Sequence, residues 1–563
     1  MRRLSGVMVF LLIFAVAITA CGPQDPTPVP TPTPSPGGEP TGPPQGGTVT
    51  MGLEGDPERF VTTIWPMASA IPVHQLVFGQ LVRPNEEMEF VPDLAESFDV
   101  SEDGLTITFN LHKDVLWHDG EPFTARDVAF TFNMMAHPDY HGGQDIQVNF
   151  IEGVEDSRAG ITDGMSGIQI IDEHTISFTA KEPYAPALSQ LTMRIIPEHL
   201  LGDVPIPELD VHEFNYNAIG TGPFRLAEYV PDRHVILEAN DDYFLGRPNV
   251  DRIIWRIASH EALLSSWLRQ EIDIVSLPVA ELDMAEGVDF GYVHEHASER
   301  PTYLGLNCQS VYFGDARVRR ALSYALDREE IVDIVIDGNG EAISQNHPAA
   351  MWAYNPNIPV PEQDLDKAGE LLDDAGWLLN ESTGVREKDG VPFEVELWYV
   401  TDREDYQEDL AALVQAQLRP VGMSVSLRAW DSPSLWPTVL PRGEAADPDG
   451  FDFMVASISI NNGDPNWMDR YLVSTTVPPH GINYFLYQNE EMDRMINEQS
   501  RMMDFDERLD YWHNTMWPFI DQEMPFVPIL NPSRFFAVND RVVGFDAAIN
   551  SRVNNVLNWY IQE

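Results

Sequence analysis

Basic residues are scarce in this chain, and lysine is nearly absent. The sequence holds 34 Lys and Arg residues against 89 Asp and Glu residues, which gives a formal net charge of −55 at pH 7. Binding to a phosphate backbone needs a basic stripe, and the sequence contains none. We therefore exclude a nucleic-acid partner. The only four lysines are Lys113, Lys181, Lys367 and Lys388. One interpretation of this excess of acidic residues is adaptation to salty or acidic surroundings. The simpler interpretation is a well-solvated acidic surface.

Cysteine is almost as rare, with two residues in the whole chain. Two cysteines are too few for a disulfide framework. We expect Cys308 to act as a small buried hydrophobic side chain. A different role is expected for Cys21, because it follows an N-terminal segment of distinct composition.

That segment, residues 1–21, is interpreted as a secretory signal peptide. It starts with Met1-Arg2-Arg3 and continues with an apolar run over residues 7–17 that is too short to span a membrane comfortably. The small residues before Cys21 resemble a bacterial lipobox, which implies lipidation of Cys21 and an extracytoplasmic, membrane-anchored protein. A plain signal peptide and an uncleaved anchor are the alternatives. Residues 22–47 are rich in Pro, Thr, Gly and Ser, which favours an extended tether.

The sequence also lacks the usual catalytic and metal motifs. No serine lies in a Gly-x-Ser-x-Gly elbow, so His118-Asp119 is interpreted as part of a turn. His294-Glu295-His296 has neither a third ligand nor the zinc-protease spacing, and an exposed acidic loop is the favoured interpretation. We therefore predict no catalytic residue, no metal site and no cofactor. A secreted hydrolase is disfavoured.

One basic patch stands out against the acidic background, at Arg317, Arg319 and Arg320. It could meet an anionic ligand or a membrane transporter. Ion pairs and helix caps with Asp315 and Asp327 are the favoured interpretation.

Residues 219–257 form the segment around which we arrange the rest of the predicted fold. Gly220-Thr221-Gly222-Pro223 predicts a tight turn. Strands are predicted after it at residues 224–226, 235–238 and 253–257, the last with alternating apolar side chains. Helical and strand patterns then alternate from about 307 to 525, which predicts a mostly parallel α/β domain. The tail from 527 is predicted to return as short strands to the first domain.

The central stretch resembles the signature segment of the family 5 extracellular solute-binding proteins, which serve ATP-driven importers of peptides, nickel and oligosaccharides. The matching pieces run in order as Gly-Thr-Gly-Pro-Phe from 220, Asn-Asp-Asp-Tyr-Phe from 240 and Gly-Arg-Pro from 246. Further pieces match at Trp117-His-Asp-Gly and at Leu371 to Trp377. Gln270 departs from the pattern, because the family often carries Gly there.

The resemblance implies an α/β, two-lobed fold of the periplasmic-binding-protein type II with an extra inserted domain. Lobe 1 is expected to comprise residues 48–80, 216–306 and 526–563, with the inserted domain at 81–215 packed on it. Lobe 2 is expected to be residues 307–525. Hinges are expected near 257–307 and 525–532, where the chain crosses between the lobes.

The loop that follows the apolar strand 453–458 is the most informative candidate for ligand binding, since open α/β sheets bind ligands beyond the carboxyl ends of their strands. In peptide receptors of the family this loop reads Asp-x-x-Asp-Pro, and the first Asp pairs with the ligand's ammonium group. Asn461 stands there in this chain, so the charge must come from Asp464 or another acid. Aromatic and amide side chains suit peptides or sugars. The predicted ligand residues are Trp65, Asn307, Trp352, Trp398, Trp430, Asn461, Asn462, Asp464 and Trp467.

The resemblance thus implies a non-enzymatic receptor that closes two lobes on a small solute and delivers it to the permease subunits of an ABC transporter. We expect an oligopeptide as ligand, with an oligosaccharide as the alternative, and a monomeric protein.

Overall fold

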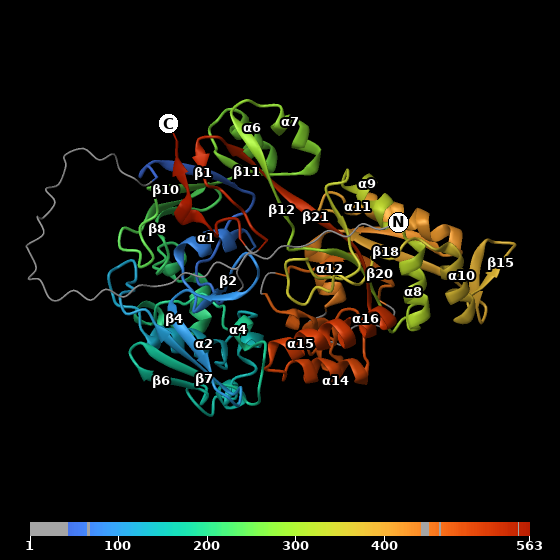
Figure 1. Cartoon of the computed structure of the whole chain (residues 1–563), viewed down its shortest axis with the longest axis horizontal. Coiled ribbons are helices and arrows are strands. Elements are labelled where there is room, and N and C mark those ends of the chain that lie inside the picture. Colours follow the sequence, from blue (N-terminus) through green and yellow to red (C-terminus); the bar gives the residue numbers. More distant parts are fainter. Residues whose placement is uncertain (1–42, 65–67, 441–449, 461–462, 550, 563) are drawn as a thin grey trace, which may run out of the picture. The chain divides into compact units, whose positions relative to one another are not determined.

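A single strand, β21 (Phe526–Asn539), lies at the centre of the largest sheet in the computed structural model of the chain (Figure 1). The structure describes residues 43–64, 68–440, 450–460, 463–549 and 551–562. The predicted signal segment with Cys21, most of the tether, and Trp65, Asn461 and Asn462 lie outside these residues. Within the described part, no helix has the length and apolar character needed to cross a membrane.

The largest sheet has twelve strands. From one edge to the other they are β19 (Ser424–Trp430), β18 (Glu394–Val400), β20 (Phe453–Ser457), β13 (Thr302–Leu306), β21, β11 (Ile274–Leu277), β1 (Thr48–Leu53), β10 (Arg252–Ile257), β9 (His234–Ala239) and β8 (Phe224–Val230). Two more strands, β12 (Gly291–Ala297) and β14 (Gly340–Ala342), also pair with β21.

β21 pairs with both halves of this sheet. The first half runs from β11 to β8, and the second half runs from β13 to β19. Its first residues pair antiparallel with β13, where Gly305 lies opposite Phe526. Its last residues pair antiparallel with β11 and β12, where Ile274 and Tyr292 both lie opposite Val538. The chain therefore crosses between the halves twice, once within β21 and once in the short link from β12 to β13. The predicted domain boundaries remain a prediction.

The strands predicted around the Gly220 turn are confirmed as β8, β9 and β10, and the tail returns to the first half of the sheet as expected. It does so as one strand of 14 residues and not as short strands only. The later domain is parallel only in part: β18 pairs parallel with β19 and β20, whereas β13 pairs antiparallel with β20 and β21. Gln270 takes a φ of 58°, so this residue adopts the left-handed turn in which the family often has glycine.

The remaining strands form smaller sheets. They are the four-stranded sheet β4 (Ala95–Val100), β5 (Thr106–Leu111), β7 (Thr175–Thr179) and β6 (Ile168–Asp172), the pair β2 (Val82–Pro84) and β3 (Phe90–Pro92), the set β15 (Leu378–Asn380), β16 (Val385–Lys388) and β17 (Val391–Pro392), and the pair β22 (Val542–Val543) and β23 (Tyr560–Ile561).

Several helices begin directly after a residue whose side chain caps them. Thr124 and Asp127 form a capping box at the start of α2 (Ala125–Met135), and the predicted caps Asp315 and Asp327 accept backbone N–H groups at the starts of α8 (Ala316–Ala325) and α9 (Arg328–Val335). The α-helices are α1 (Ile71–Val77), α2 (Ala125–Met135), α3 (Val154–Arg158), α4 (Ala187–Gln190), α5 (Glu198–Leu201), α6 (His260–Leu268), α7 (Leu282–Glu286), α8 (Ala316–Ala325), α9 (Arg328–Val335), α10 (Leu365–Asp374), α11 (Gln407–Leu418), α12 (Ser432–Val439), α13 (Asp469–Leu472), α14 (Glu490–Gln499), α15 (Phe505–Tyr511) and α16 (Trp517–Glu523).

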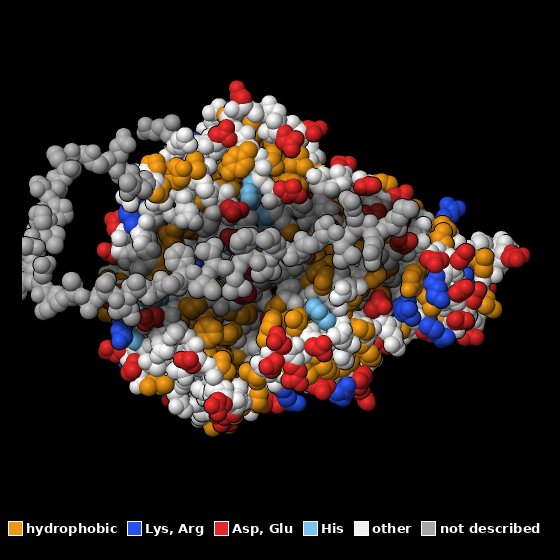
Figure 2. Space-filling view, in the orientation of Figure 1, with side chains coloured by type: hydrophobic (Ala, Val, Ile, Leu, Met, Phe, Trp, Pro, Cys, Tyr) orange, Lys and Arg blue, Asp and Glu red, His pale blue; other side chains and the backbone are white. Residues whose placement is uncertain are grey.

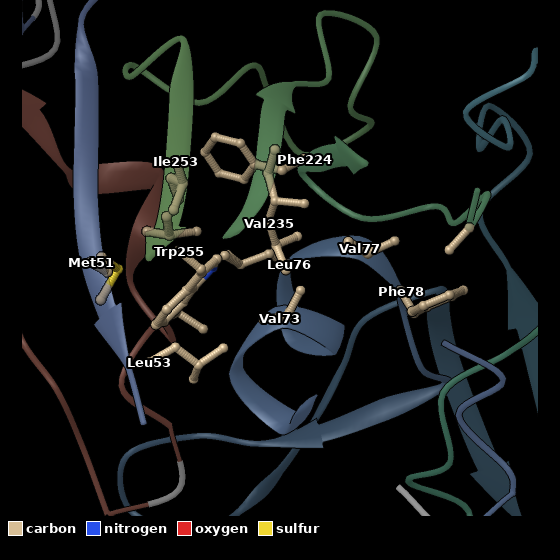
Figure 3. Packing of buried hydrophobic residues seen from close by; sticks show 14 of the residues in the cluster. Met51, Leu53, Val73, Leu76, Val77, Phe78, Phe224, Val235, Ile253 and Trp255 are labelled. Carbon is tan, nitrogen blue, oxygen red and sulfur yellow. The ribbon is translucent and has the colours of Figure 1, made fainter. Parts of the chain in front are cut away.

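The Gly220 turn closes over one of the hydrophobic cores. That core packs α1 against strands β1, β8, β9 and β10, and Figure 3 shows Trp255 and Val235 facing Leu76. A Cβ atom on Gly220 would stand 1.8 Å from the carbonyl oxygen of Val77, so only glycine fits. The ring of His118 lies beside the same turn, with Nδ1 accepting the Gly220 N–H at 3.1 Å. His118 thus has the structural role predicted for it.

Acidic side chains are spread over the face of the molecule that Figure 2 shows, and basic side chains are fewer there. This distribution agrees with the formal net charge of −55. Charges that are spread out and solvated in this way repel one another less than charges in a single cluster.

Candidate ligand-binding site

The segment after β20 holds two of the described predicted ligand residues, Asp464 and Trp467. Residues 465–468 form a 3₁₀ turn that is capped by Asp464, and α13 follows directly. The segment faces residues 182–190 of the predicted inserted domain. Ser189 Oγ lies 3.4 Å from Asn466 Oδ1, and the Ala185 N–H donates at 2.7 Å to the carbonyl of Ser500, a residue at the end of α14.

Asp464 forms a buried ion pair in this segment. Its two carboxylate oxygens accept hydrogen bonds from the Arg508 guanidinium at 2.7 and 2.9 Å, and Oδ1 also accepts the Asn466 N–H at 3.0 Å. The side chains of Asp464 and Arg508 are only 5% and 6% exposed. This bidentate geometry fixes the loop to α15. Asp464 therefore has a structural partner, and its predicted ligand role remains a prediction.

A cavity of 430 Å³ lies between this segment and the predicted inserted domain. Trp467 and Ser459 line it from one side, and Tyr184 and Gln190 line it from the other. Trp467 is the only one of the described predicted ligand residues that lines it. Aromatic rings with adjacent amide and hydroxyl groups are typical of small-ligand sites.

Asp469 also lines this cavity, and the sequence reasoning missed it. Burial raises the pKa of its carboxyl group to about 8, and the neighbouring charge of Asp464 acts in the same direction. Arg508 and Arg470 act in the opposite direction. Among the described residues, Asp469 forms no ion pair. At neutral pH this carboxyl group is therefore mostly protonated, and it can pair with a cationic group of a ligand once it releases its proton.

A second cavity of 310 Å³ shares Ser459 with the first. It lies where β21 meets loops from both halves of the sheet, and arginine side chains dominate its charged lining: Arg300, Arg534 and Arg552. No sequence pattern indicated this cluster, because its members lie in separate parts of the chain: Arg300 lies between β12 and β13, Arg534 lies within β21, and Arg552 lies beyond β22.

The other described ligand candidates pack into the protein. Trp398 and Trp430 lie on the neighbouring strands β18 and β19 with ring centroids 4.9 Å apart, and Arg428 stacks on Trp430 at 4.3 Å. Trp352 packs against the Arg508 guanidinium at 5.0 Å. Asn307 is fully buried, and its amide donates to the Phe451 carbonyl at 2.8 Å. A ligand role for these residues remains a prediction, and Trp65, Asn461 and Asn462 lie outside the described residues.

The sequence motifs with alternative roles have structural partners. Two arginines of the basic patch have separate partners. Arg317 pairs with Asp315, and Arg319 is buried and donates to the carbonyl groups of Glu523 and Phe313. His294 and His296 lie on strand β12 and not in a loop, and the His294 ring lies 3.1 Å from the Ala547 carbonyl oxygen. Within the described residues, no group of acidic, histidine or cysteine side chains is arranged to hold a metal ion.

Comparison with known proteins gives a consistent result along the chain. Oligopeptide-binding protein AppA of Bacillus subtilis is 27% identical over 569 residues, which cover 100% of this chain and 99% of that protein. A putative ABC transporter peptide-binding protein of Brucella ovis is 30% identical over 450 residues, 78% of this chain and 79% of that protein.

Solved structures show the same fold. The structure of Bacillus subtilis AppA in complex with a nonapeptide matches with a TM-score of 0.76 at 26% identity, over 93% of this chain and 100% of that one. The predicted two-lobed α/β fold is thereby confirmed. The family model described as "Bacterial extracellular solute-binding proteins, family 5 Middle" matches residues 89–477. The chain belongs to the family 5 extracellular solute-binding proteins.

Proposed function

We propose that this chain is the peptide-binding receptor of an ABC importer. The observation that carries the proposal is the agreement between two facts. Relatives that match the chain along most or all of its length are named as peptide-binding proteins, and the cavity beside Trp467 holds a carboxyl group that could receive a peptide's ammonium group.

Asp469 is the residue that we assign to that ammonium group. Asn461 has no charge, and Asp464 is held by Arg508. Asp469 lines the cavity with Trp467 and Tyr184, whose rings offer apolar faces to side chains of the peptide. Once Asp469 has released its proton, its carboxylate and the peptide's ammonium group would form a charge-assisted hydrogen bond, which is about twice as strong as a neutral one.

Family membership and the N-terminal sequence support the remaining features of the proposal. The receptor is not an enzyme, uses no cofactor and acts as a monomer that docks on permease subunits in the membrane. Cys21 carries the lipid anchor, and the body is held outside the cytoplasm by the Pro-rich tether.

Calorimetry against pools of short peptides and of oligosaccharides tests the ligand class. We expect saturation by peptides at one equivalent, and unchanged peptide masses afterwards because the protein does not hydrolyse them. Asn461→Asp adds a second carboxylate and is expected to strengthen peptide binding. Binding of oligosaccharides by the unmodified protein, weakened by Asn461→Asp, would favour the alternative ligand class, because the carboxylate lacks the amide's donor.

A further inference from the structure

The arginine-lined cavity is unusual for a protein of this charge. Three guanidinium groups, those of Arg300, Arg534 and Arg552, line a space of 310 Å³ in a chain whose formal net charge is −55. Glu299 is the one carboxylate among the described residues that line it. The local balance is therefore positive, opposite to that of the protein as a whole.

Two of these arginines have a carboxylate partner behind the cavity wall. Arg534 makes two hydrogen bonds to Glu404, at 3.0 and 3.1 Å. Arg300 lies 3.5 Å from the same carboxylate and also bonds to Ser457 at 3.0 Å. One glutamate thus compensates two arginines, which leaves the pair with a net positive charge.

Arg552 is in a different state. Within the described residues its guanidinium group forms no hydrogen bond and no ion pair, and it lies over the face of the Phe536 ring at 5.5 Å from the centroid. A guanidinium group carries five donors in a fixed planar array that matches a carboxylate. In a chain with more than twice as many acidic as basic residues, an arginine without a carboxylate partner needs an explanation.

The environment of Arg552 also favours an incoming anion. Burial lowers the pKa of its guanidinium group, and the nearby charge of Arg534 acts in the same direction, while Glu299 and Glu54 act against it. The group remains charged because an arginine does not lose its proton at neutral pH. An anion that replaced lost hydration around these donors would therefore be stabilised more than at an open surface.

We propose that this cavity is a carboxylate-binding subsite for the ligand and that Arg552 donates to the carboxylate. The inference rests on the proposed peptide-receptor function. Ser459 lines both cavities, so one extended peptide can reach Asp469 with its ammonium group and Arg552 with a carboxylate. The carboxylate comes either from the peptide's C-terminus or from an acidic side chain.

The test uses the full chain and four pools of short synthetic peptides. The pools have free or amidated C-termini, each with and without Asp and Glu. Binding of every pool is measured by calorimetry for the unmodified protein, for Arg552→Gln and for Arg252→Gln. The control removes the same charge from an exposed arginine on β10 that pairs with Glu238. Thermal melting confirms that both variants are folded.

We expect Arg552→Gln to weaken binding of at least one carboxylate-bearing pool by about tenfold or more, the range for hydrogen bonds to charged groups. The amidated pool without acidic residues should bind Arg552→Gln and the unmodified protein alike. A selective loss for free C-termini identifies the terminal carboxylate, and a selective loss for acidic pools identifies a side chain.

Equal binding of all pools by Arg552→Gln and the unmodified protein would overturn the subsite, and so would an equal loss for all four pools. Either result leaves the peptide-receptor function standing, because the unmodified protein still binds. Failure of the unmodified protein to bind any pool would instead overturn the proposed function and this inference with it.

Discussion

Replacement of Asp464 by asparagine should destabilise the protein and not merely change its ligand affinity. The carboxylate is 5% exposed and pairs with Arg508, which is 6% exposed, through two bonds of 2.7 and 2.9 Å. The variant keeps one acceptor but leaves a buried guanidinium group without a counter-charge. Loss of one partner of a buried ion pair raises the free energy of the folded state by about 3–5 kcal/mol.

The size of the effect can be bounded from the contacts around Arg508. The asparagine that replaces Asp464 would still accept one hydrogen bond, and Gln499 Oε1 and the Trp352 ring remain beside the guanidinium group at 2.9 Å and 5.0 Å. These contacts stabilise the remaining positive charge, so we place the loss for Asp464→Asn at the lower end, about 3 kcal/mol.

A double-mutant cycle isolates the pair. Asp464→Asn, Arg508→Met and the double variant are unfolded with urea, and unfolding is followed by tryptophan fluorescence. The double variant should be less destabilised than the sum of the single variants by about 2 kcal/mol, because neither buried charge is then left alone. Peptide affinity is measured in parallel. A stability change of less than about 1 kcal/mol for Asp464→Asn, combined with a loss of peptide binding, would refute the structural role, since Asp464 would then be a ligand anchor.

Three further predictions concern other parts of the chain. Gly220→Ala should destabilise the protein by at least about 1–3 kcal/mol, because its Cβ would stand 1.8 Å from the Val77 carbonyl oxygen, whereas Gly369→Ala, whose Cβ would meet only the end of the Arg386 side chain at 3.3 Å, should be tolerated; similar melting temperatures would contradict this. The raised pKa of Asp469, about 8 against an ordinary value of 3.8, means that the folded protein binds a proton more tightly than the unfolded chain, so this residue's contribution to stability falls as pH rises from about 4 to 8. Asp469→Asn should remove that fall, and in the unmodified protein peptide binding at pH 6 should release a proton that calorimetry in two buffers detects; no release would argue against Asp469 as the ammonium partner. Cys21→Ser should move the protein out of the membrane fraction, since a lipid anchor contributes about 0.8 kcal/mol per buried CH₂, and a variant that still sediments with membranes would contradict the lipobox.

Local signals predicted much of the fold. The alternation in residues 253–257 and the turn at Gly220 indicated β10 and β8, and the caps at Asp315 and Asp327 indicated two helix starts. Each of these depends on residues a few positions apart, so the sequence displays it directly.

β21 was harder to predict as one strand because it contains Pro528 and Pro532. Proline lacks the N–H that a central strand donates, so these residues suggest breaks in the strand. In the structure they lie opposite Tyr303 of β13 and Gly340 of β14, near the point where β21 passes from one half of the sheet to the other. Only the pairing of distant strands shows that the chain continues through them.

The candidate site depended even more on distant contacts. Asp464 and Arg508 are 44 residues apart, and no pattern near either residue announces their pairing. The same holds for Asp469, which lies a few residues after the loop that matches Asp-x-x-Asp-Pro. Asp469 becomes a site candidate only because residues between 146 and 190 form the other side of the cavity. The motif thus indicated a segment that lines the cavity, whereas the individual charged residues required the structure.

The position of β21 in the chain has a consequence for biogenesis. More than 520 residues precede Phe526, yet both halves of the twelve-stranded sheet pair with β21. Neither half can complete its hydrogen-bond ladder while the ribosome is still adding those earlier residues. A chain that finishes its central sheet so late stays without its final structure during synthesis. That delay suits the export that the N-terminal signal predicts, in which a chain is threaded through a membrane before it folds.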